Sequence, residues 1–209
     1  MTSRSLHGRS RRERSLLTGI LLTLGVGILT GLVTFIGQGL MPGQWNTLVN
    51  SGAIWLVPVF FVGSSTRSIV WAAVAGAGTL VATVAGYYGS AAVSGAPISV
   101  RAVAFWLVMA LGAGPLYGVA GRCWPCDRRA LRVFGVALLG GVFVAEGLYL
   151  LLALRYYWSG STMVAAGVVA AFLLARREDR LRTLLAAPLP AVAAGAVYAA
   201  LNSLFQIAG

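Results

Sequence analysis

Apolar runs of membrane-spanning length recur along almost the whole chain, separated by short segments that hold most of its charges. Only 10% of the 209 residues are charged and 58% are hydrophobic, with a mean hydropathy of +0.84. Soluble domains carry about 25% charged residues. So few charges cannot cover a water-facing surface, and the chain is therefore expected to be a polytopic membrane protein.

The runs are continuously apolar rather than alternating, which favours membrane-spanning helices over a β-barrel. A helix needs about 20 apolar residues to cross the roughly 30 Å hydrocarbon core. Seven segments fit, the two shortest with an aromatic anchor at their start: residues 15–40, 45–63, 68–88, 102–121, 133–154, 158–175 and 184–208. The expected fold is all-α, a polytopic transmembrane helix bundle of about seven spans. Residues 15–209 then form a single domain behind a basic cytoplasmic tail of residues 1–14.

Arginine is distributed unevenly between alternate connecting segments. With the N-terminus inside, the outer segments hold only Arg101 and Arg155 of the sixteen arginines. The other fourteen fall inside: Arg4, Arg9, Arg11, Arg12, Arg14, Arg67, Arg122, Arg128, Arg129, Arg132, Arg176, Arg177, Arg180 and Arg182. This asymmetry follows the positive-inside rule. We therefore expect the N-terminus inside and the C-terminus outside, in a bacterial cytoplasmic (inner) membrane.

The net charge of +11 would favour nucleic-acid binding in a soluble chain. Here membrane topology explains the arginines, and no nucleic-acid partner is expected. The expected partners are the lipid bilayer and a small molecule or ion. Small-residue helix faces also allow a partner membrane subunit or a homo-oligomer.

Glu146 is the only acidic residue within a predicted span. A rise of 1.5 Å per residue places it about 20 Å from the inner end of its helix, in the outer half of the bilayer. A charged residue near the centre of a spanning helix costs roughly 2.5–3.5 kcal/mol, so Glu146 is expected to face the bundle interior. It could be a cation or proton site or a polar contact for a substrate. The alternative is an interhelical hydrogen bond that fixes packing.

Uncharged polar residues of the spans also favour the outer half. Tyr149 lies one helical turn beyond Glu146 on the same face. This distribution predicts an outward-opening polar pocket with Glu146 at its floor. Its expected lining is Tyr149, Gln38, Asn50, Tyr88 and Asn202. Amides and hydroxyls at ordinary helix ends would give the same distribution.

Pro115 lies within a glycine-rich stretch of the fourth predicted span. Proline removes one helix hydrogen bond, and the neighbouring glycines make a kink easy. Gly114 and Gly118 also form a small-xxx-small face. The stretch therefore predicts either a broken helix at a binding site or, more simply, close helix packing.

Cys123 and Cys126 form a C-x-x-C sequence with Pro125 before the second cysteine. Such a pair can serve in thiol–disulfide exchange, and two chains together could bind zinc. No thioredoxin-like pattern surrounds it, its loop faces the reducing side, and the only histidine is His7 in the tail. An ordinary short loop is the simpler interpretation, and no cofactor and no metal site are expected.

Several short strings together resemble one group of proteins. They are Asn50-Ser51 with Trp55 and Gly63, Gly86-Tyr87-Tyr88, and Phe105-Trp106 followed by Gly114-Pro115 and Gly118. The chain thereby resembles a family of small multi-pass membrane proteins of high-GC actinobacteria that has no known function. The resemblance extends from the first span to the fifth, including Glu146. It implies an integral protein of the bacterial inner membrane and no particular activity.

The favoured function is therefore small-molecule or ion binding, as a transport-like or sensor component, with Glu146 as the charged contact. A membrane-embedded enzyme acting on a lipid or isoprenoid, with Glu146 as general acid/base, is an alternative. No catalytic constellation accompanies this single acid, which favours a non-enzymatic role. The third possibility is a structural or assembly subunit of a membrane complex.

Overall fold

The protein is all-helical throughout the part of the chain that its structure describes. A computed structural model describes residues 3–190, 192, 193 and 196, with side chains from Leu17 onward. Its helices are α1 (Ser3–Leu40), α2 (Trp45–Val49), α3 (Gly52–Ser64), α4 (Ile69–Val93), α5 (Val100–Cys123), α6 (Arg129–Leu152), α7 (Tyr157–Leu174), the 3₁₀ helix η1 (Arg177–Asp179) and α8 (Arg180–Ala186). The predicted all-α class is confirmed.

Six helical segments of the described chain are long and apolar enough to cross a membrane. They are Leu17–Leu40, Trp45–Ser64, Ile69–Val93, Val100–Cys123, Arg129–Leu152 and Tyr157–Leu174. They correspond to the first six predicted spans, and the protein is a multi-pass membrane protein. The seventh predicted span, 184–208, starts inside α8 and lies mostly outside the described residues.

Large apolar side chains cover the outside of this bundle. Leu21 on α1, Val70 on α4, Leu111 on α5 and Leu173 on α7 are each 65% exposed or more. Such a surface would be unfavourable in water, whereas lipid tails solvate it without cost. The outward-facing residues therefore have the chemistry of a lipid-facing surface.

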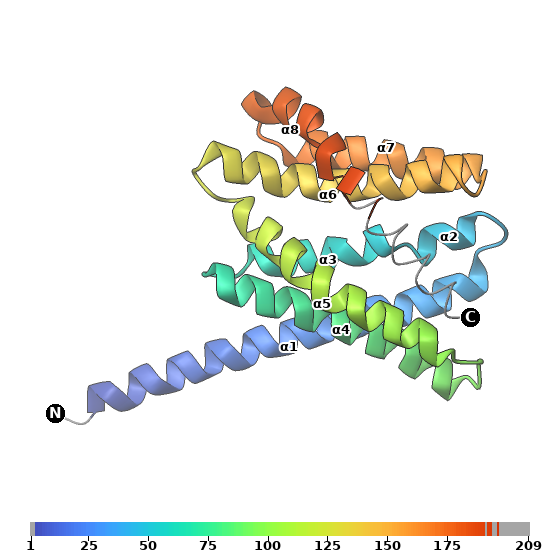
Figure 1. Ribbon diagram of the computed structural model, residues 1–209. Helices are drawn as coiled ribbons and strands as arrows, with labels where there is room; N and C mark the ends of the chain where they lie inside the picture. Colours follow the sequence, from blue (N-terminus) through green and yellow to red (C-terminus); the bar gives the residue numbers. More distant parts are fainter. Residues whose placement is uncertain (1–2, 191, 194–195, 197–209) are drawn as a thin grey trace.

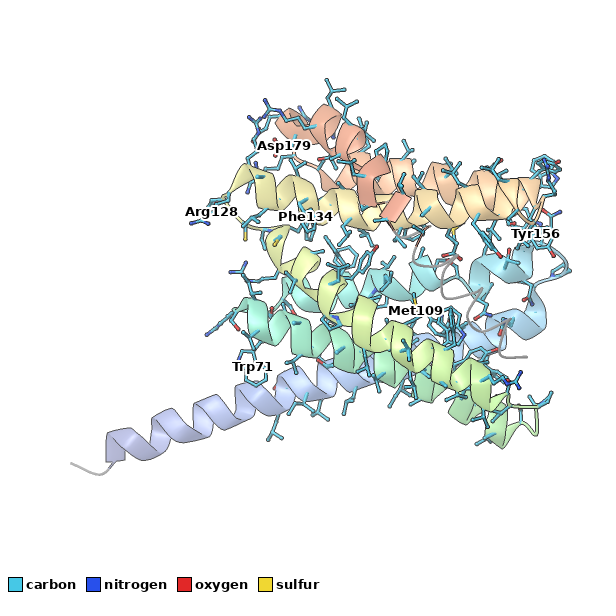
Figure 2. All side chains as sticks on the ribbon, viewed as in Figure 1. Trp71, Met109, Arg128, Phe134, Tyr156 and Asp179 are labelled. Carbon is cyan, nitrogen blue, oxygen red and sulfur yellow. The ribbon has the colours of Figure 1, made fainter. Side chains whose placement is uncertain are left out.

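The helices form two layers with α3 between them (Figure 1). In one layer α1 packs along α4 and α4 packs along α5, while α6 and α7 form the other layer. The connections alternate between the two ends of the bundle. One end, here called the arginine-rich end, carries the loops that contain Arg67, Arg128 and Arg176. Figure 2 shows Arg128 and Asp179 at this end and Tyr156 at the opposite end.

Glycines let the helix backbones approach each other closely. In α5, a Cβ at Gly114 would lie 2.7 Å from the Ala77 Cα, and one at Gly118 would meet the Ala72 carbonyl of α4. A Cβ at Gly147 of α6 would lie 2.8 Å from the Gly160 carbonyl oxygen of α7. The two layers are thus each held by contacts that tolerate no side chain.

Helix α5 runs without a break through Pro115. Since Gly114 and Gly118 on either side of it pack directly on α4, the close-packing interpretation of this stretch holds.

The core lies around α3 and is dominated by large side chains. Trp55 and Phe60 of α3 are fully buried, together with Leu139 of α6 and Met163 of α7. The Trp55 indole N–H donates to the Thr34 hydroxyl over 3.0 Å, which ties α3 to α1. Tryptophan can be buried at this site because its one polar atom has a partner.

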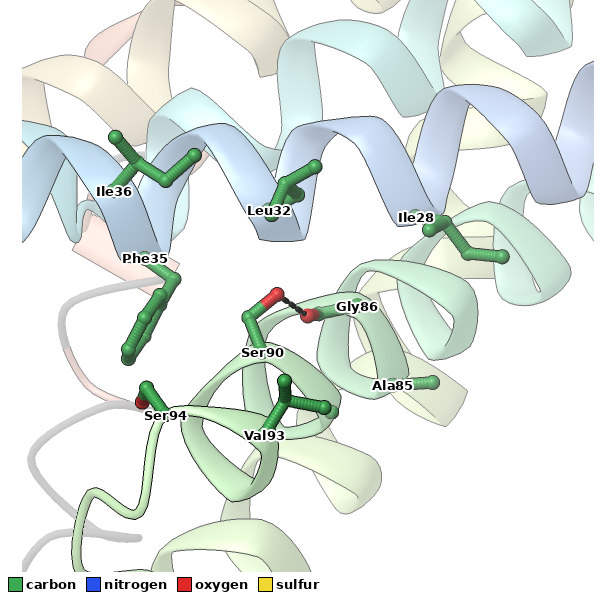
Figure 3. Close-up of a pocket in the computed structure, with 10 residues that line it drawn as sticks. Ile28, Leu32, Phe35, Ile36, Ala85, Gly86, Ser90, Val93 and Ser94 are labelled. Carbon is green, nitrogen blue, oxygen red and sulfur yellow. Dashed lines mark hydrogen bonds between the residues drawn. The ribbon is translucent and has the colours of Figure 1, made fainter.

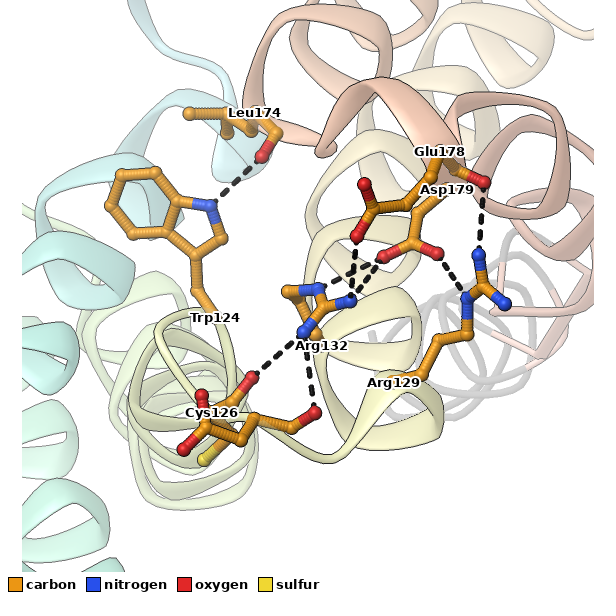
Figure 4. A network of polar contacts seen from close by, with 8 residues as sticks. Trp124, Cys126, Arg129, Arg132, Leu174, Glu178 and Asp179 are labelled. Carbon is orange, nitrogen blue, oxygen red and sulfur yellow. Dashed lines mark hydrogen bonds and ion pairs between the residues drawn. The ribbon is translucent and has the colours of Figure 1, made fainter.

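A polar network closes the arginine-rich end of the second layer (Figure 4). Asp179 of η1 accepts hydrogen bonds from Arg129 and Arg132 at the start of α6. Trp124 extends the link, because its indole N–H donates to the Leu174 carbonyl over 2.9 Å. The loop before α6 is thereby attached to the segment that follows α7.

Candidate functional site

The second membrane span is broken into two helices. Helix α2 ends at Val49 and α3 begins at Gly52, with the extended Ser51 between them as the N-cap residue. The Ser51 hydroxyl oxygen accepts a hydrogen bond from the Ile54 N–H over 3.2 Å. This start leaves other N–H groups of the first turn of α3 without partners in their own helix.

Glu146 of α6 supplies a partner for these groups. Its Oε2 atom accepts a hydrogen bond from the Ala53 N–H at 2.8 Å, across 93 positions of sequence. The Ser51 side chain and the Gly52 N–H are further hydrogen-bonding partners of the same carboxylate. The acid of one span therefore caps the broken helix of another.

This arrangement accounts for a charge inside the bundle. Charge-assisted hydrogen bonds are roughly twice as strong as neutral ones. The N-terminus of a helix also carries about half a positive elementary charge, which stabilises a nearby anion. Together these interactions reduce the roughly 2.5–3.5 kcal/mol that inserting a carboxylate near a helix centre costs.

A cavity of about 700 Å³ lies beside this carboxylate. Its described lining comes from α2, α3, α4, α5 and α6, with Pro190 and Ala193 from the segment after α8. Most of the lining is apolar, and Asn46, Thr47 and Asn50 contribute polar groups near the break in the second span. The volume falls in the range of about 300–1,000 Å³ that is usual for small-molecule sites.

Two tryptophans line the cavity together with Glu146. Trp55 and Trp106 both line the cavity, with ring centroids 4.8 Å apart. The Trp106 ring approaches Gly52 so closely that a Cβ there would lie 3.6 Å from the ring, and the same point lies 3.9 Å from the Glu146 carboxylate. Gly52 therefore leaves a corner in which an aromatic ring and a carboxylate face the same small space.

Three of the six predicted lining residues meet at this cavity. Glu146, Tyr149 and Asn50 are all among its described lining residues. Gln38 contacts the cavity wall from behind, because its backbone carbonyl accepts a 2.6 Å hydrogen bond from the side chain of the lining residue Asn46. These residues come from three separate elements, so the fold brings together positions far apart in the sequence.

Of the other two predicted residues, one is absent from the described lining and one lies outside the described residues. Tyr88 packs against the core and contacts Tyr87 edge-on, with centroids 5.0 Å apart, and does not appear in the described lining. Its neighbour Tyr87 is the one that joins the polar network, by donating a hydrogen bond to the Gln38 side chain. Asn202 lies outside the described residues.

The predicted set omitted Trp106, Ala53 and Tyr117. Trp106 and Tyr117 line the cavity from α5, and Ala53 contributes only its backbone N–H. The side chain of Ala53 gives no sign of this role, because only its backbone N–H takes part. The string Asn50-Ser51-Gly52 within an apolar run is nevertheless a helix-start signal. That signal predicts unpaired N–H groups at this depth, and with them a role for Glu146.

The cysteine pair lies at the arginine-rich end, away from this cavity. Cys123 is buried, both thiols are free, and the Cys126 thiol lies 3.4 Å from the Arg122 carbonyl oxygen. Within the described residues, no group of three or more His, Cys, Asp or Glu side chains could hold a metal ion.

A second hollow, of about 500 Å³, lies between α1 and α4 (Figure 3). Its lining is almost wholly apolar, and its Ser90 hydroxyl is bonded to the Gly86 carbonyl over 2.7 Å. Since no described lining residue is charged, this hollow has the chemistry of a lipid-facing groove, and the cavity at Glu146 is the stronger candidate site.

Comparison with known proteins identifies a family but no activity. The model of a family of unknown function, DUF6518, matches residues 10–204. No curated protein and no solved structure matches the chain.

Proposed function

The chain belongs to this family of unknown function, and we propose that it binds a small molecule or ion in the cavity at Glu146, as a transport-like component of a bacterial cytoplasmic membrane. The observation that carries the proposal is the position of Glu146: a carboxylate on the wall of a largely apolar cavity of about 700 Å³, held there by the start of α3. An acid within the membrane is costly, and an ionisable residue at such a place is by default a functional-site hypothesis.

The proposed orientation places the cavity toward the outer side. Glu146 lies six residues before the end of α6 at Leu152, which corresponds to about 9 Å along the helix. That end is opposite the arginine-rich end, which the positive-inside rule assigns to the cytoplasm. Asn46, Thr47 and Asn50 line the cavity close to the same end and supply a polar entrance.

Binding is favoured over catalysis by the composition of the cavity wall. Enzymes that use carboxylates in acid–base catalysis commonly pair two titrating groups whose surroundings separate their pKa values. Glu146 is the only acid among the described lining residues, and the single histidine of the chain is His7. A binding site needs only the shape, the apolar wall and the one charge that the cavity offers.

A ligand-stabilisation screen tests the proposal. The purified full chain in detergent is heated with a panel of small cations, amines, acids and neutral lipophilic compounds, and the melting temperature is recorded. We expect at least one compound to raise it, because a ligand that binds only the folded state stabilises that state. The rise should disappear in Glu146→Gln, which keeps the shape of the side chain and removes its charge.

The matched control is Glu178→Gln, the same change on an acid outside the cavity whose side chain is 61% exposed. It should keep the full ligand response. A stabilising compound whose effect survives both Glu146→Gln and Glu146→Leu would show that the carboxylate has no part in binding.

A further inference from the structure

We infer that the ligand is an organic cation with an apolar body, a conclusion that rests on the proposed binding function and adds its chemical class. The inference depends on four features of the cavity: the sign of its charge, its aromatic wall, its size, and the way Glu146 is held.

The charge that the cavity can carry is negative. Glu146 is the one charged side chain among the described lining residues. The C-terminal stretch of residues 183–209, which supplies Pro190 and Ala193 to the lining, contains no Arg, Lys, Asp, Glu or His. Its side chains therefore cannot bring a counter-charge. A cation is therefore attracted to this cavity, and an anion would meet a like charge without a basic side chain to bind it.

The wall around the carboxylate is aromatic. Trp55, Trp106, Tyr117 and Tyr149 all line the cavity. Tryptophan and tyrosine rings attract cations through the negative potential of their faces, and this attraction grows when the cation has lost its water. The corner at Gly52, where the Trp106 ring and the Glu146 carboxylate converge, is the place where both attractions act on one group.

The size and polarity of the cavity fit an organic cation better than a metal ion. A volume of about 700 Å³ with a mostly apolar wall accommodates several rings or alkyl groups. A hard cation such as Ca²⁺ requires six to eight oxygen ligands. The described residues hold no cluster of three or more acids, histidines or cysteines.

The carboxylate can hold a cation without releasing α3. An ionised carboxyl group has about four acceptor positions. The Ala53 N–H occupies one of them on Oε2, and the Ser51 side chain and Gly52 N–H lie on the same α3 side. The helix start thus orients the carboxylate and favours its ionised form over the neutral one, and since Glu146 lines the cavity, its remaining acceptor position is left for a cation on that side.

Two ions of the same shape and opposite charge test the inference. Tetraphenylphosphonium and tetraphenylborate are titrated calorimetrically into the full chain in detergent, with empty micelles as the blank. We expect tetraphenylphosphonium to bind roughly tenfold more tightly or better, the size of effect that one carboxylate with aromatic partners gives. Glu146→Gln should reduce this preference about tenfold while the protein stays folded.

The aromatic contribution has its own matched pair. Trp106→Leu should weaken tetraphenylphosphonium binding severalfold, whereas Trp71→Leu should leave it unchanged because Trp71 is 57% exposed on the outside of α4. Equal weakening by both variants would overturn the assigned place of the cation.

The outcomes separate this inference from the proposed function. Equal binding of the two ions, or tighter binding of tetraphenylborate, would overturn the cation class, and the proposed function would still stand if Trp106→Leu weakened that binding. Binding of neither ion would also overturn the cation class. In that case the proposed function is decided independently by the melting-temperature screen with neutral and acidic compounds. The comparison is whether a compound that stabilises the wild type fails to stabilise Glu146→Gln.

Discussion

The guanidinium of Arg132 and the carboxylate of Asp179 are almost completely buried and face each other across the arginine-rich end of the bundle. Arg132 Nη2 lies 2.6 Å and Nε 2.9 Å from Asp179 Oδ2, with the two side chains 5% and 1% exposed. Arg132 also donates to the Cys126 carbonyl over 3.1 Å. One pair of charges therefore connects the loop before α6 with the loop after α7.

Replacing Asp179 by Asn should destabilise the protein. The substitution removes the buried counter-charge of Arg132 and leaves it only the exposed Glu178 carboxylate at 3.8 Å, and a buried charge that has lost its close partner is far more costly than a pair. The melting temperature of the purified protein should fall clearly below that of Glu178→Gln, which changes an exposed neighbour. Equal melting temperatures of the two variants would mean that the pair contributes no stability.

The same pair should make stability depend on pH in the acidic range. The hydrogen bond from Arg129, and with it Arg132, lowers the pKa of the Asp179 carboxyl against the opposing effect of burial. A lowered pKa in the folded state gives stability that is complete above the unfolded value of about 3.9 and is lost as the pH falls through the folded value. The gap in melting temperature between the wild type and Asp179→Asn should therefore be constant from pH 7 to about 5. It should narrow below about pH 4, and a constant gap down to pH 3 would contradict this assignment.

Two glycines of α3 should differ in how much stability the protein loses when each is replaced by alanine. Gly63→Ala places a methyl group against the Gly118 backbone of α5, with the Gly118 Cα only 2.7 Å away. Overpacking of this kind costs about 1–3 kcal/mol. Gly52→Ala meets nothing nearer than 3.6 Å, so it should fold as well as the wild type. Thermal melting of the two variants checks this, and a stable Gly63→Ala would mean that α3 and α5 can separate at little cost.

The sequence was informative where a residue contradicts its surroundings. Glu146 in an apolar run had to face the interior, and the structure places it at a cavity there. The lengths of the apolar runs identified the first six spans. Both inferences depend on the bilayer, which penalises every exposed polar group in the same way.

The sequence was weak where the result depends on how helices pack against each other. The length of the segment 45–63 predicts one span, and the start of α3 within it shows in the sequence only as the short string Asn50-Ser51-Gly52. Tyr87 and Tyr88 are adjacent, and only the rotation of α4 decides that Tyr87 reaches Gln38. Trp106 joins the site from α5 for the same reason, since the phase of one helix relative to another is a property of packing rather than composition.

Two serines at equivalent helix ends can test the proposed orientation. Ser65 ends α3 and Ser94 ends α4, and each is exposed with its hydroxyl bonded to a carbonyl three residues back. The C-terminal ends of α3 and α4, which these serines cap, lie at opposite ends of the bundle (Figure 1). In a background carrying Cys123→Ser and Cys126→Ser, a membrane-impermeant maleimide added to intact cells should label Ser94→Cys and not Ser65→Cys. The reverse labelling would invert the proposed topology.

Glu146 has a structural contribution that must be separated from binding. Glu146→Leu leaves the Ala53 N–H without its partner, and an unsatisfied buried donor costs about 1–3 kcal/mol. Glu146→Gln keeps an oxygen that can accept this hydrogen bond and should lose less. The order of melting temperatures in the absence of ligand should therefore be wild type, then Gln, then Leu.

The same three proteins then separate the two roles of the residue. If Glu146 acts only as the cap of α3, the Gln variant should retain ligand binding in proportion to its stability. If the charge contacts the ligand, Glu146→Gln should lose binding although it melts close to the wild type, because its cap is preserved while its charge is not. Binding by Glu146→Leu at wild-type strength would exclude both a charge contact and a cap that shapes the cavity.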